Sequence, residues 1–588
     1  MSVARYLEGV LVLGFVLGPH CVTGWLLRRR LVPAWRGATA VLAQAVLSVS
    51  SIVLTAELLG AVGQFRSVAL GVGALVVLGL TVVIVRETGA PPAPHAAEPD
   101  DANADADAGP PSALGWLTIA AVVGLTMAQA GTYAVDAARR GILEPDSVIY
   151  HLPFAGSFVQ TGSLTAFHFV YPEFPWHLNP STGELFHAFG LLAFDNESLT
   201  PVINLGWLAL ALLAGWCVGR PYGRSPLTLL GAAIVVDAPV MINAGGAEND
   251  VAAVALVLAM VAFLLHRPRW TPSHLVLAGL AAGLAISVKL PALPIVGVTV
   301  VLVLAVMPRA SRTRAGAVFA GSVLVTGSYW YVRNLVRTGS PLSSVSLVVF
   351  PSASFAIVDR FGYSVADYLR HPGLAREVLP PLVHFAWGPA WLLTFGLAGA
   401  GAVVAAIDRD RLLRVLGIAS LVAVAVWLVT PTTALGEFGQ PLLFPSNSRY
   451  VAPALAVALT VAPLVRRLSS PRSGVVVGVL YALALLVGAT NGMRASWVTD
   501  QLLGGVVVGV VAVAALWGMR GSALSRSVAA AVAIAGVGWF VLTGTSHRAD
   551  AVGLARWAES IPPAHIGVES GVVTSWFLYG DHLANTVE

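Results

Sequence analysis

The feature that most constrains this chain is a long series of apolar segments. Crossing the hydrocarbon core of a bilayer takes about 20 mostly apolar residues in a helix. The chain holds about 16 such segments; hydrophobic residues make up 57% of its 588 positions and charged residues only 11%. A soluble globular protein carries about 25% charged residues. The sequence therefore predicts an all-α polytopic membrane protein with about 13–16 transmembrane helices.

The expected spans are spread along the whole chain. They lie roughly at 8–27, 37–59, 67–85, 114–134, 200–219, 226–243, 248–266, 273–288, 291–307, 314–336, 387–407, 412–430, 450–465, 474–490, 501–518 and 526–545. The first of them ends in Arg28-Arg29-Arg30, a stop-transfer pattern rather than the cleavage site of a signal peptide. Cys21 and Cys217 are isolated, so their spacing predicts neither a disulfide nor a metal site.

Arginine placement predicts the orientation of these spans. Alternate connections carry the basic residues, and cytoplasmic loops of membrane proteins are rich in lysine and arginine. These connections include Arg28 to Arg36, Arg220 and Arg224, Arg267 and Arg269, Arg309 to Arg314, Arg409 to Arg414, Arg466 to Arg472, and Arg520 and Arg526. We therefore expect a multi-pass protein of the cell membrane whose long loops, 136–199, 338–386 and 431–449, face the external side.

The same pattern divides the chain into five parts. We expect an accessory N-terminal transmembrane module, a disordered acidic cytoplasmic linker, a catalytic transmembrane core, further C-terminal helices and a short external tail. These parts are 1–86, 87–113, 114–465, 466–545 and 546–588. The linker reads as disordered because it is acidic, rich in alanine and proline, and almost without apolar bulk.

The first polar cluster follows the span at 114–134. Glu144, Asp146, Tyr150 and His151 lie within the segment 141–153, and carboxylates at a membrane boundary are costly unless they face water, a partner or a substrate. Asp146 can accept a proton from an attacking hydroxyl if its geometry and pKa suit. Glu144 can share that task or bind a cation. The alternative is that Asp146 only caps the helix that follows.

The remainder of the first external loop is rich in aromatic residues. Aromatic, histidine and carboxylate side chains alternate over 167–177, and Glu184 follows. Apolar ring faces pack on sugar C–H surfaces while polar edges bond hydroxyls, so this composition suits a sugar or a lipid headgroup. The alternative is an interfacial amphipathic loop with Trp and Tyr at headgroup depth.

A second acidic cluster occupies a tight turn on the same predicted side. Glu248 and Asp250 follow Gly245 and Gly246, and glycines permit close backbone approach. The functional interpretation is a second polar wall of one external cavity. The structural alternative is that both acids complement the dipole at the start of a helix.

Four basic residues interrupt the positive-inside pattern or stand alone. Lys289 is the single lysine and lies in a proline-broken segment, while Arg333, Arg337 and Arg449 lie at external ends of spans. Ammonium and guanidinium groups bind phosphate oxygens. The alternatives are snorkelling to the interface and a structural role at helix ends.

Taken in order, these motifs resemble the GT-C superfamily of integral-membrane glycosyltransferases. The similarity is greatest to bacterial members related to protein O-mannosyltransferases and lipid A aminoarabinose transferases, and it covers roughly 114–465. The matching segments are Glu-Pro-Asp-Ser-Val-Ile-Tyr-His at 144–151, Gly-Ala-Glu-Asn-Asp at 246–250, Lys-Leu-Pro at 289–291, Arg-Asn-Leu-Val-Arg-Thr-Gly-Ser-Pro at 333–341 and Ser-Arg-Tyr-Val-Ala-Pro at 448–453. The resemblance implies a long first external loop with short amphipathic helices.

The resemblance also implies an activity. It implies an inverting transfer of a sugar from a polyprenyl-phosphate-linked donor to a glycan, lipid or protein acceptor on the external face, with no nucleic-acid partner. Catalysis is expected from Asp146 and Glu144. The expected substrate-binding residues are Tyr150, His151, Glu184, Glu248, Asp250, Lys289, Arg333 and Arg449.

One departure and one rival function stay open. Glu144-Pro145-Asp146 stands where an Asp-x-Asp motif is expected, so dependence on a divalent cation is left open. The rival is a non-catalytic membrane protein, such as a transporter or flippase for a lipid-linked glycan, or a scaffold. A transporter should show inverted repeats and mid-span ionisable residues; no repeat is seen, and the polar clusters gather at one predicted face.

Overall fold

The structure is a computed structural model. It describes residues 2–88, 113–168, 174–237, 240–266, 270–342, 350, 355–495, 499–518, 536, 558, 560–566, 575–579 and 583–587. Most of the predicted acidic linker, almost all of the predicted span at 526–545 and much of the predicted tail lie outside the described residues.

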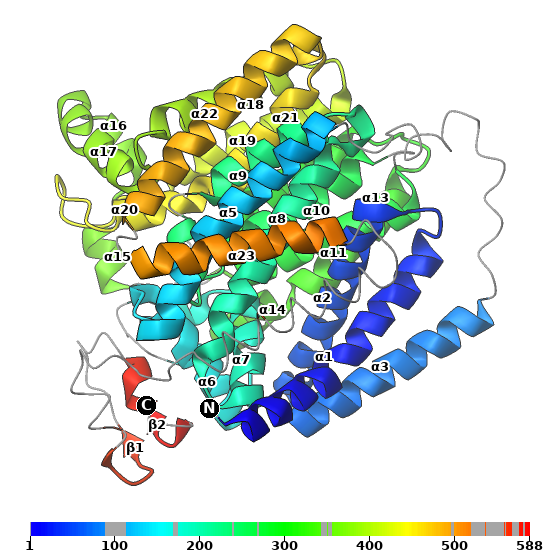
Figure 1. Ribbon diagram of the computed structural model, residues 1–588, viewed down its shortest axis with the longest axis vertical. Helices are drawn as coiled ribbons and strands as arrows, with labels where there is room; N and C mark the ends of the chain where they lie inside the picture. The colour runs from blue at the N-terminus through cyan, green and yellow to red at the C-terminus, as the bar shows by residue number, and fades with distance from the viewer. Residues whose placement is uncertain are drawn as a thin grey trace.

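Three long helices open the chain and pack together at one side of the bundle (Figure 1). They are α1 (Val3–Leu31), α2 (Gly37–Ala61) and α3 (Ser67–Glu87). The Ser2 side chain caps α1 by accepting from the backbone N–H of Arg5 at 3.2 Å. The last turn of α1 carries Arg28, Arg29 and Arg30, where positive charge complements the helix dipole.

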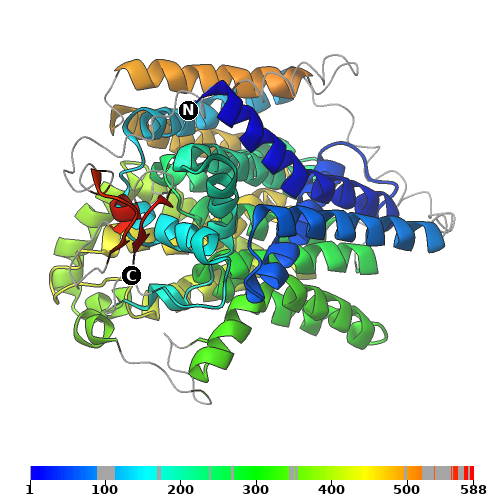
Figure 2. The same ribbon diagram turned by 90° about the horizontal axis from the view of Figure 1, so that it is seen from below.

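The central bundle is built mostly from apolar helices, together with the amphipathic helix α14. Its members are α5 (Ala113–Arg140), α8 (Thr200–Gly219), α9 (Ser225–Val236), α10 (Asp250–Leu265), α11 (Pro272–Val288), α12 (Leu293–Val306), α13 (Arg312–Gly327), α14 (Tyr329–Thr338), α18 (Trp391–Ala406), α19 (Arg411–Val429), α21 (Ala452–Val461), α22 (Pro471–Ala495) and α23 (Thr499–Gly518). All sixteen residues of α10 are buried, which places this helix at the centre. Helix α23 lies along α5 (Figures 1 and 2).

Shorter elements form the connections. They are η1 (Ser147–His151), α6 (Leu152–Thr161), η2 (Pro175–Leu178), α7 (Thr182–Phe194), η3 (Glu197–Leu199), η4 (Arg220–Tyr222), η5 (Met241–Gly245), η6 (Leu290–Ala292), α15 (Ala356–Phe361), α16 (Val365–Leu369), α17 (Pro372–Trp387), α20 (Phe444–Asn447), η7 (Ser448–Val451), η8 (Ala462–Leu464), η9 (Arg466–Leu468), β1 (His565–Ile566), η10 (Ser575–Tyr579) and β2 (Thr586–Val587). The short helices η1, α6, η2 and α7 fall within the loop predicted at 136–199. The two strands pair in parallel.

The helix lengths confirm a polytopic all-α protein. Within the described residues, seven helices are long and apolar enough to cross a membrane, and up to nine if each bent pair is one span. The pair α13 and α14 bends by 66°, and the pair α17 and α18 by 95°. Further apolar helices of 10–17 residues include α9, α10 and α11.

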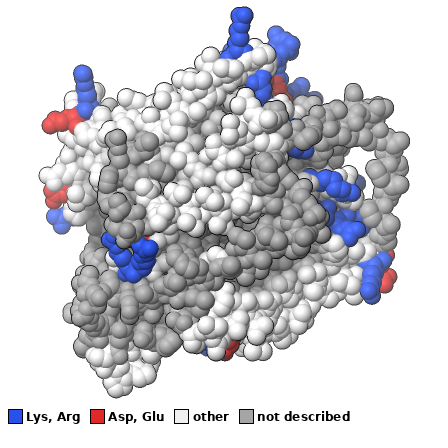
Figure 3. Space-filling model, in the orientation of Figure 1, with Lys and Arg blue, Asp and Glu red and all other residues white. Residues whose placement is uncertain are grey.

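The surface has the character expected of a protein solvated by lipid. Large apolar side chains such as Leu75, Leu80 and Val475 are exposed on the outer helices, whereas an ordinary soluble surface avoids large apolar patches. On the face seen in Figure 3 the described surface is mostly uncharged, with few lysine, arginine, aspartate or glutamate side chains.

Candidate functional site

The turn after α5 is held by Glu144. One carboxylate oxygen of Glu144 accepts from the backbone N–H of Asp146 at 3.2 Å, and the other accepts from the N–H and the hydroxyl of Ser147, both at 2.8 Å. These bonds satisfy the free N–H groups at the start of η1. Glu144 therefore does the capping that the sequence left open for Asp146.

The Asp146 side chain makes no capping hydrogen bond and points instead to other side chains. It forms an ion pair with the Arg449 guanidinium, which comes from η7 near the other end of the chain. The Tyr150 hydroxyl, one helical turn later, donates to the same carboxylate at 3.3 Å. Asp146 is thus positioned by partners that a simple helix cap does not require.

The turn before α10 docks directly on the turn after α5. The backbone N–H of Ala247 donates to the Ser147 hydroxyl at 2.7 Å, and the Asn204 amide on α8 donates to the Gly246 carbonyl at 2.7 Å. A Cβ atom at Gly246 would lie 2.5 Å from the Ser147 oxygen, so this approach requires glycine. The contact brings Glu248 and Asp250 beside Asp146.

Two cations lie among these three acids. The Arg449 Nε lies 3.1 Å from an Asp250 oxygen, and another guanidinium nitrogen lies 3.6 Å from Glu248. The Lys289 ammonium at the end of α11 donates to Asp250 at 2.6 Å. The structure therefore gathers five predicted site residues, Asp146, Glu248, Asp250, Lys289 and Arg449, which we call the ion-pair cluster.

Burial raises the pKa of each acid in the ion-pair cluster, but the net pKa shifts of Asp146 and Glu248 are opposite. Burial raises the pKa of Asp146, but Arg449 and nearby positive groups outweigh it and hold that pKa below its ordinary value. The pKa of Glu248 is raised well above its ordinary value by burial, with Arg449 opposing and Glu144 and Asp146 adding to the rise. The surroundings thus favour the ionised form of Asp146 and the protonated form of Glu248.

A second buried pair lies next to the cluster. The His151 imidazole and the Glu184 carboxylate, from η1 and α7, meet at 2.6 Å and are each 3% exposed. The Asn249 amide also lies 3.4 Å from the same His151 nitrogen. Buried groups of this kind need partners. Through Asn249, this pair ties the loop predicted at 136–199 to the turn that carries Glu248.

The structure places Arg333 apart from the ion-pair cluster. Its guanidinium donates to the His177 carbonyl at 2.7 Å and lies over the rings of Phe167 and Trp330 at 4.9 and 4.7 Å. Among the described residues no hydrogen bond or ion pair joins Arg333 to the cluster acids. Arg333 therefore holds η2 in place through the His177 carbonyl.

The aromatic part of the first loop forms a stack of rings next to the ion-pair cluster. Trp176 lies between Tyr150 and Phe174, with ring centroids 4.9 and 4.5 Å away and nearly parallel planes. Because Tyr150 also bonds Asp146, the stack reaches the ion-pair cluster. Residues 169–173 of this loop lie outside the described residues.

The cluster does not have the form of a divalent cation site. Among the described residues no group of three or more His, Cys, Asp or Glu side chains is arranged to hold a metal ion. The Arg449 guanidinium lies between Asp146, Glu248 and Asp250 and contacts all three carboxyl groups. The cation left open by the sequence thus has no fitting donor set here.

Sequence reasoning did not single out three residues that shape the site. Ser147 and Asn204 hold the Glu248 turn, and the Tyr450 ring lies 5.6 Å from Arg449 and 5.8 Å from Lys289. Tyr450 follows Arg449 directly, so its position in the Ser-Arg-Tyr motif is the signal that could have found it. A serine in a turn and an asparagine in an apolar span carry no comparable signal.

The comparisons with known proteins find similarity in structure alone. No protein-family model matches the chain, and no curated protein matches it. A structure of ArnT from Cupriavidus metallidurans bound to undecaprenyl phosphate aligns with a TM-score of 0.45 and 19% identity, covering 80% of this chain and 86% of that one. An oligosaccharyltransferase from Archaeoglobus fulgidus aligns with a TM-score of 0.38 and 13% identity, covering 79% and 62%.

Both of these proteins are members of the GT-C superfamily, which the sequence motifs resemble. At identities below 20% and TM-scores below 0.5, however, the likeness assigns neither a family nor an activity to this chain. What the chain does must be argued from the contacts of its own residues.

Proposed function

We propose that this protein is a membrane glycosyltransferase that moves a sugar from a polyprenyl-phosphate-linked donor to an acceptor on the external face of the membrane. The observation that carries the proposal is the ion-pair cluster. Four separate elements bring an ionised carboxylate, two further buried acids and two cations to one place at the ends of apolar helices. Burying several charges together costs desolvation free energy, and ionisable groups buried at membrane depth usually serve a function.

The proposed reaction is a single displacement at the anomeric carbon. The acceptor hydroxyl oxygen forms a bond to that carbon, and the bond from the carbon to the donor phosphate oxygen breaks with its electron pair going to the phosphate. Asp146 takes the proton of the hydroxyl as general base. The stereochemistry of the sugar is inverted, and polyprenyl phosphate is released.

The cations and the neutral acid have roles that follow from their charge. Lys289 and Arg449 stabilise the negative charge that develops on the leaving phosphate, exchanging part of their contact with Asp250 for contact with phosphate oxygens. Glu248, whose raised pKa favours the protonated form, donates a hydrogen bond rather than adding negative charge beside the phosphate. Glu144 acts as a positioning residue through the Asp146–Ser147 turn.

The remaining predicted site residues contact the substrates in this proposal. Tyr150 and the Trp176 stack offer flat apolar faces for a sugar ring, and the His151–Glu184 pair supports the wall behind them. Arg333 lies at the edge of the first loop, where the lipid-linked donor enters. Undecaprenyl phosphate, which the Cupriavidus ArnT structure holds, is the first lipid carrier to test.

A deletion strain complemented with single variants tests the proposal. Mass spectrometry of envelope glycans, glycolipids and glycoproteins should show one sugar missing in the deletion strain. The wild-type gene should restore it, and Asp146→Asn should lower it by about 10²- to 10⁴-fold, the usual contribution of a general base. Asp136→Asn is the matched control, because Asp136 pairs with Arg140 one turn away at the half-exposed end of α5 and is not a member of the ion-pair cluster.

The rival function predicts a different product. In proteoliposomes a glycosyltransferase releases free polyprenyl phosphate as it consumes the lipid-linked sugar, whereas a flippase moves the intact lipid across the bilayer. Normal glycans in the deletion strain, full restoration by Asp146→Asn, or sugar movement without release of polyprenyl phosphate would each contradict the proposal.

A further inference from the structure

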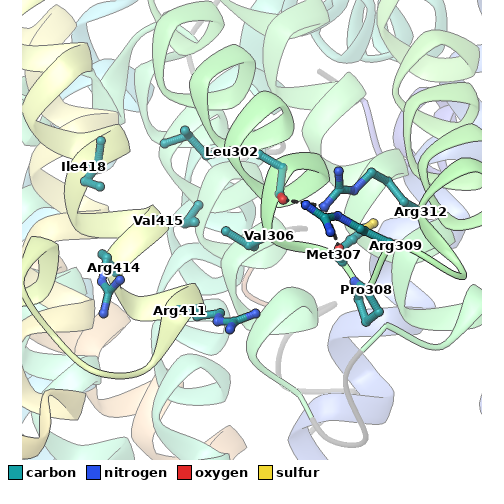
Figure 4. Close-up of a pocket in the computed structure, with 11 residues that line it drawn as sticks. Leu302, Val306, Met307, Pro308, Arg309, Arg312, Arg411, Arg414, Val415 and Ile418 are labelled. Carbon is teal, nitrogen blue, oxygen red and sulfur yellow. Dashed lines mark hydrogen bonds between the residues drawn. The ribbon is translucent and has the colours of Figure 1, made fainter.

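A pocket of about 530 Å³ lies between α12, α13 and α19, far from the ion-pair cluster (Figure 4). Helix α12 begins just after Lys289 and ends at the pocket. Its 14 residues correspond to a rise of about 21 Å. The pocket therefore lies toward the opposite face of the bundle, which the arginine pattern of the sequence assigns to the cytoplasm.

Two separate connections each supply two arginines to this pocket. Arg309 and Arg312 come from the connection between α12 and α13, and Arg411 and Arg414 come from the first turn of α19. Figure 4 shows Arg309 and Arg312 together on one side and Arg411 and Arg414 on the other. Four like charges at one place repel each other, so the arrangement favours an anion between them.

The protein itself neutralises little of this charge. Arg312 donates to the carbonyls of Ala305 and Met307 at 2.8 and 3.0 Å, and Arg414 donates to the Asp408 carbonyl. Carbonyl groups orient a guanidinium but carry no net charge. Within the described part of the chain, no hydrogen bond or ion pair involves the Arg309 or Arg411 side chain.

The acids nearest the pocket hydrogen-bond to other groups, including the Tyr222 hydroxyl, which donates to Asp410 at 3.4 Å. The Asp408 carboxylate accepts from the N–H groups of Asp410 and Arg466 at 2.8 and 3.0 Å. The Asp410 carboxylate accepts from the Leu412 N–H at 2.9 Å, capping α19. Asp410 also borders a neighbouring pocket of about 440 Å³ that shares Val306, Pro308 and Arg411. Because four arginines stand against these two carboxylates, the four-arginine pocket keeps a net positive charge.

The rest of the lining is apolar and continues along the helices. Leu302 and Val306 on α12 lie across from Val415 and Ile418 on α19 in Figure 4. A free phosphate ion makes no favourable contact with this apolar wall. An amphiphile with an anionic headgroup and hydrocarbon chains matches both parts.

We propose that this pocket binds the phosphate headgroup of an anionic phospholipid from the surrounding leaflet, with its acyl chains along α12 and α19. The N-terminal ends of α13 and α19 add positive potential to that of the arginines. The proposal concerns a lipid that the protein holds in the membrane, and it is independent of the proposed sugar transfer.

Native mass spectrometry of the full-length protein in detergent tests this inference. The probes are phosphatidylglycerol, phosphatidylcholine with the same acyl chains, and inorganic phosphate as a competitor. Wild-type protein should bind phosphatidylglycerol saturably and with preference over phosphatidylcholine. The double variant Arg309→Gln, Arg411→Gln should bind it about thirtyfold more weakly, since each arginine near an anionic headgroup contributes about 1 kcal/mol.

The matched control is the double variant Arg467→Gln, Arg472→Gln. Both arginines are exposed, lie on the same predicted side of the membrane and lower the net charge equally when replaced, but do not border the pocket. This control should bind like wild type. Equal weakening in both double variants, absence of preference over phosphatidylcholine, or full displacement by inorganic phosphate would each overturn the inference.

Wild-type protein offers a test that does not depend on a variant. Phosphatidylglycerol with a photoreactive group near its headgroup should label peptides that contain 302–312 or 411–418. Labelling spread evenly over all helix ends would show ordinary annular lipid and overturn the inference even if the double variant fails to fold.

Discussion

At the residue scale, Glu248 allows a sharp prediction about stability and pH. Burying its carboxyl group costs much more free energy when the group is ionised than when it is protonated. The side chain is fully buried, and burial, together with Glu144 and Asp146 and against Arg449, raises its pKa well above the ordinary value. The folded protein thus keeps a proton that the unfolded chain loses from about pH 4.3 upward. Stability should fall as the pH rises from there toward the raised pKa of Glu248.

Glu248→Gln isolates this effect, because glutamine has nearly the shape of a protonated carboxyl and cannot ionise. At about pH 4, below the pKa of the unfolded chain, the variant and wild type should unfold at nearly the same temperature. The difference should then grow in favour of the variant by about 1.4 kcal/mol for each pH unit between the two pKa values. Thermal unfolding in one detergent across this range measures it. A constant difference at all pH values would show that Glu248 is ionised in the fold.

The sequence predicted which charged residues meet, but not what holds them. Asp146, Glu248 and Arg449 share one predicted face of the membrane, and that is why their grouping could be expected. The bond from Ala247 to the Ser147 hydroxyl could not, because a serine in a turn has no charge or periodicity that marks it. Arg333 carries the same charge as Arg449, and only packing on Phe167 and Trp330 decides that it lies elsewhere.

At the element scale, one buried threonine connects three helices. The Thr182 hydroxyl at the start of α7 donates to Glu57 on α2 at 3.3 Å and accepts from the Trp330 indole on α14 at 2.7 Å. Glu184 lies two residues further along α7. The contact means that the first three helices, expected to form an accessory module, touch the part of the core that supports the site.

Thr182→Val keeps the size of the side chain but leaves Glu57 and Trp330 without this partner. Buried polar groups left unpaired cost about 1–3 kcal/mol each, so the variant should unfold at a clearly lower temperature. Thr182→Ser keeps the hydroxyl and should lie much closer to wild type. If valine and serine variants unfold alike, lost packing and not the hydrogen bonds explains the change.

Apolar length predicted most helices, whereas their bends needed the tertiary structure. The expected spans at 37–59 and 67–85 correspond closely to α2 and α3, since about 20 apolar residues mark a span by themselves. The expected span at 314–336 is instead bent by 66° between α13 and α14. At this break a Cβ atom on Gly327 would lie 2.9 Å from Ile286, a close approach to α11 that no local pattern reveals.

At the scale of the whole molecule, α12 and α19 both run from the neighbourhood of the ion-pair cluster to the four-arginine pocket. One end of each helix lies near the ion-pair cluster, through Lys289 and through the bond from Trp427 to the Asn447 carbonyl. The other ends carry the arginines of the four-arginine pocket. If the arginine rule sets the orientation, the cluster and the pocket face opposite sides of the membrane, and labelling from outside the cell can distinguish them.

Two matched arginines make that test direct. Arg376 on α17 and Arg409 before α19 are both exposed and fall on opposite predicted sides. In a background with Cys21→Ser and Cys217→Ala, a membrane-impermeant maleimide applied to intact cells should label Arg376→Cys and spare Arg409→Cys. Both should react after the membrane is permeabilised, which controls for access. Labelling of Arg409→Cys alone in intact cells would place the ion-pair cluster in the cytoplasm, where an external acceptor cannot reach it.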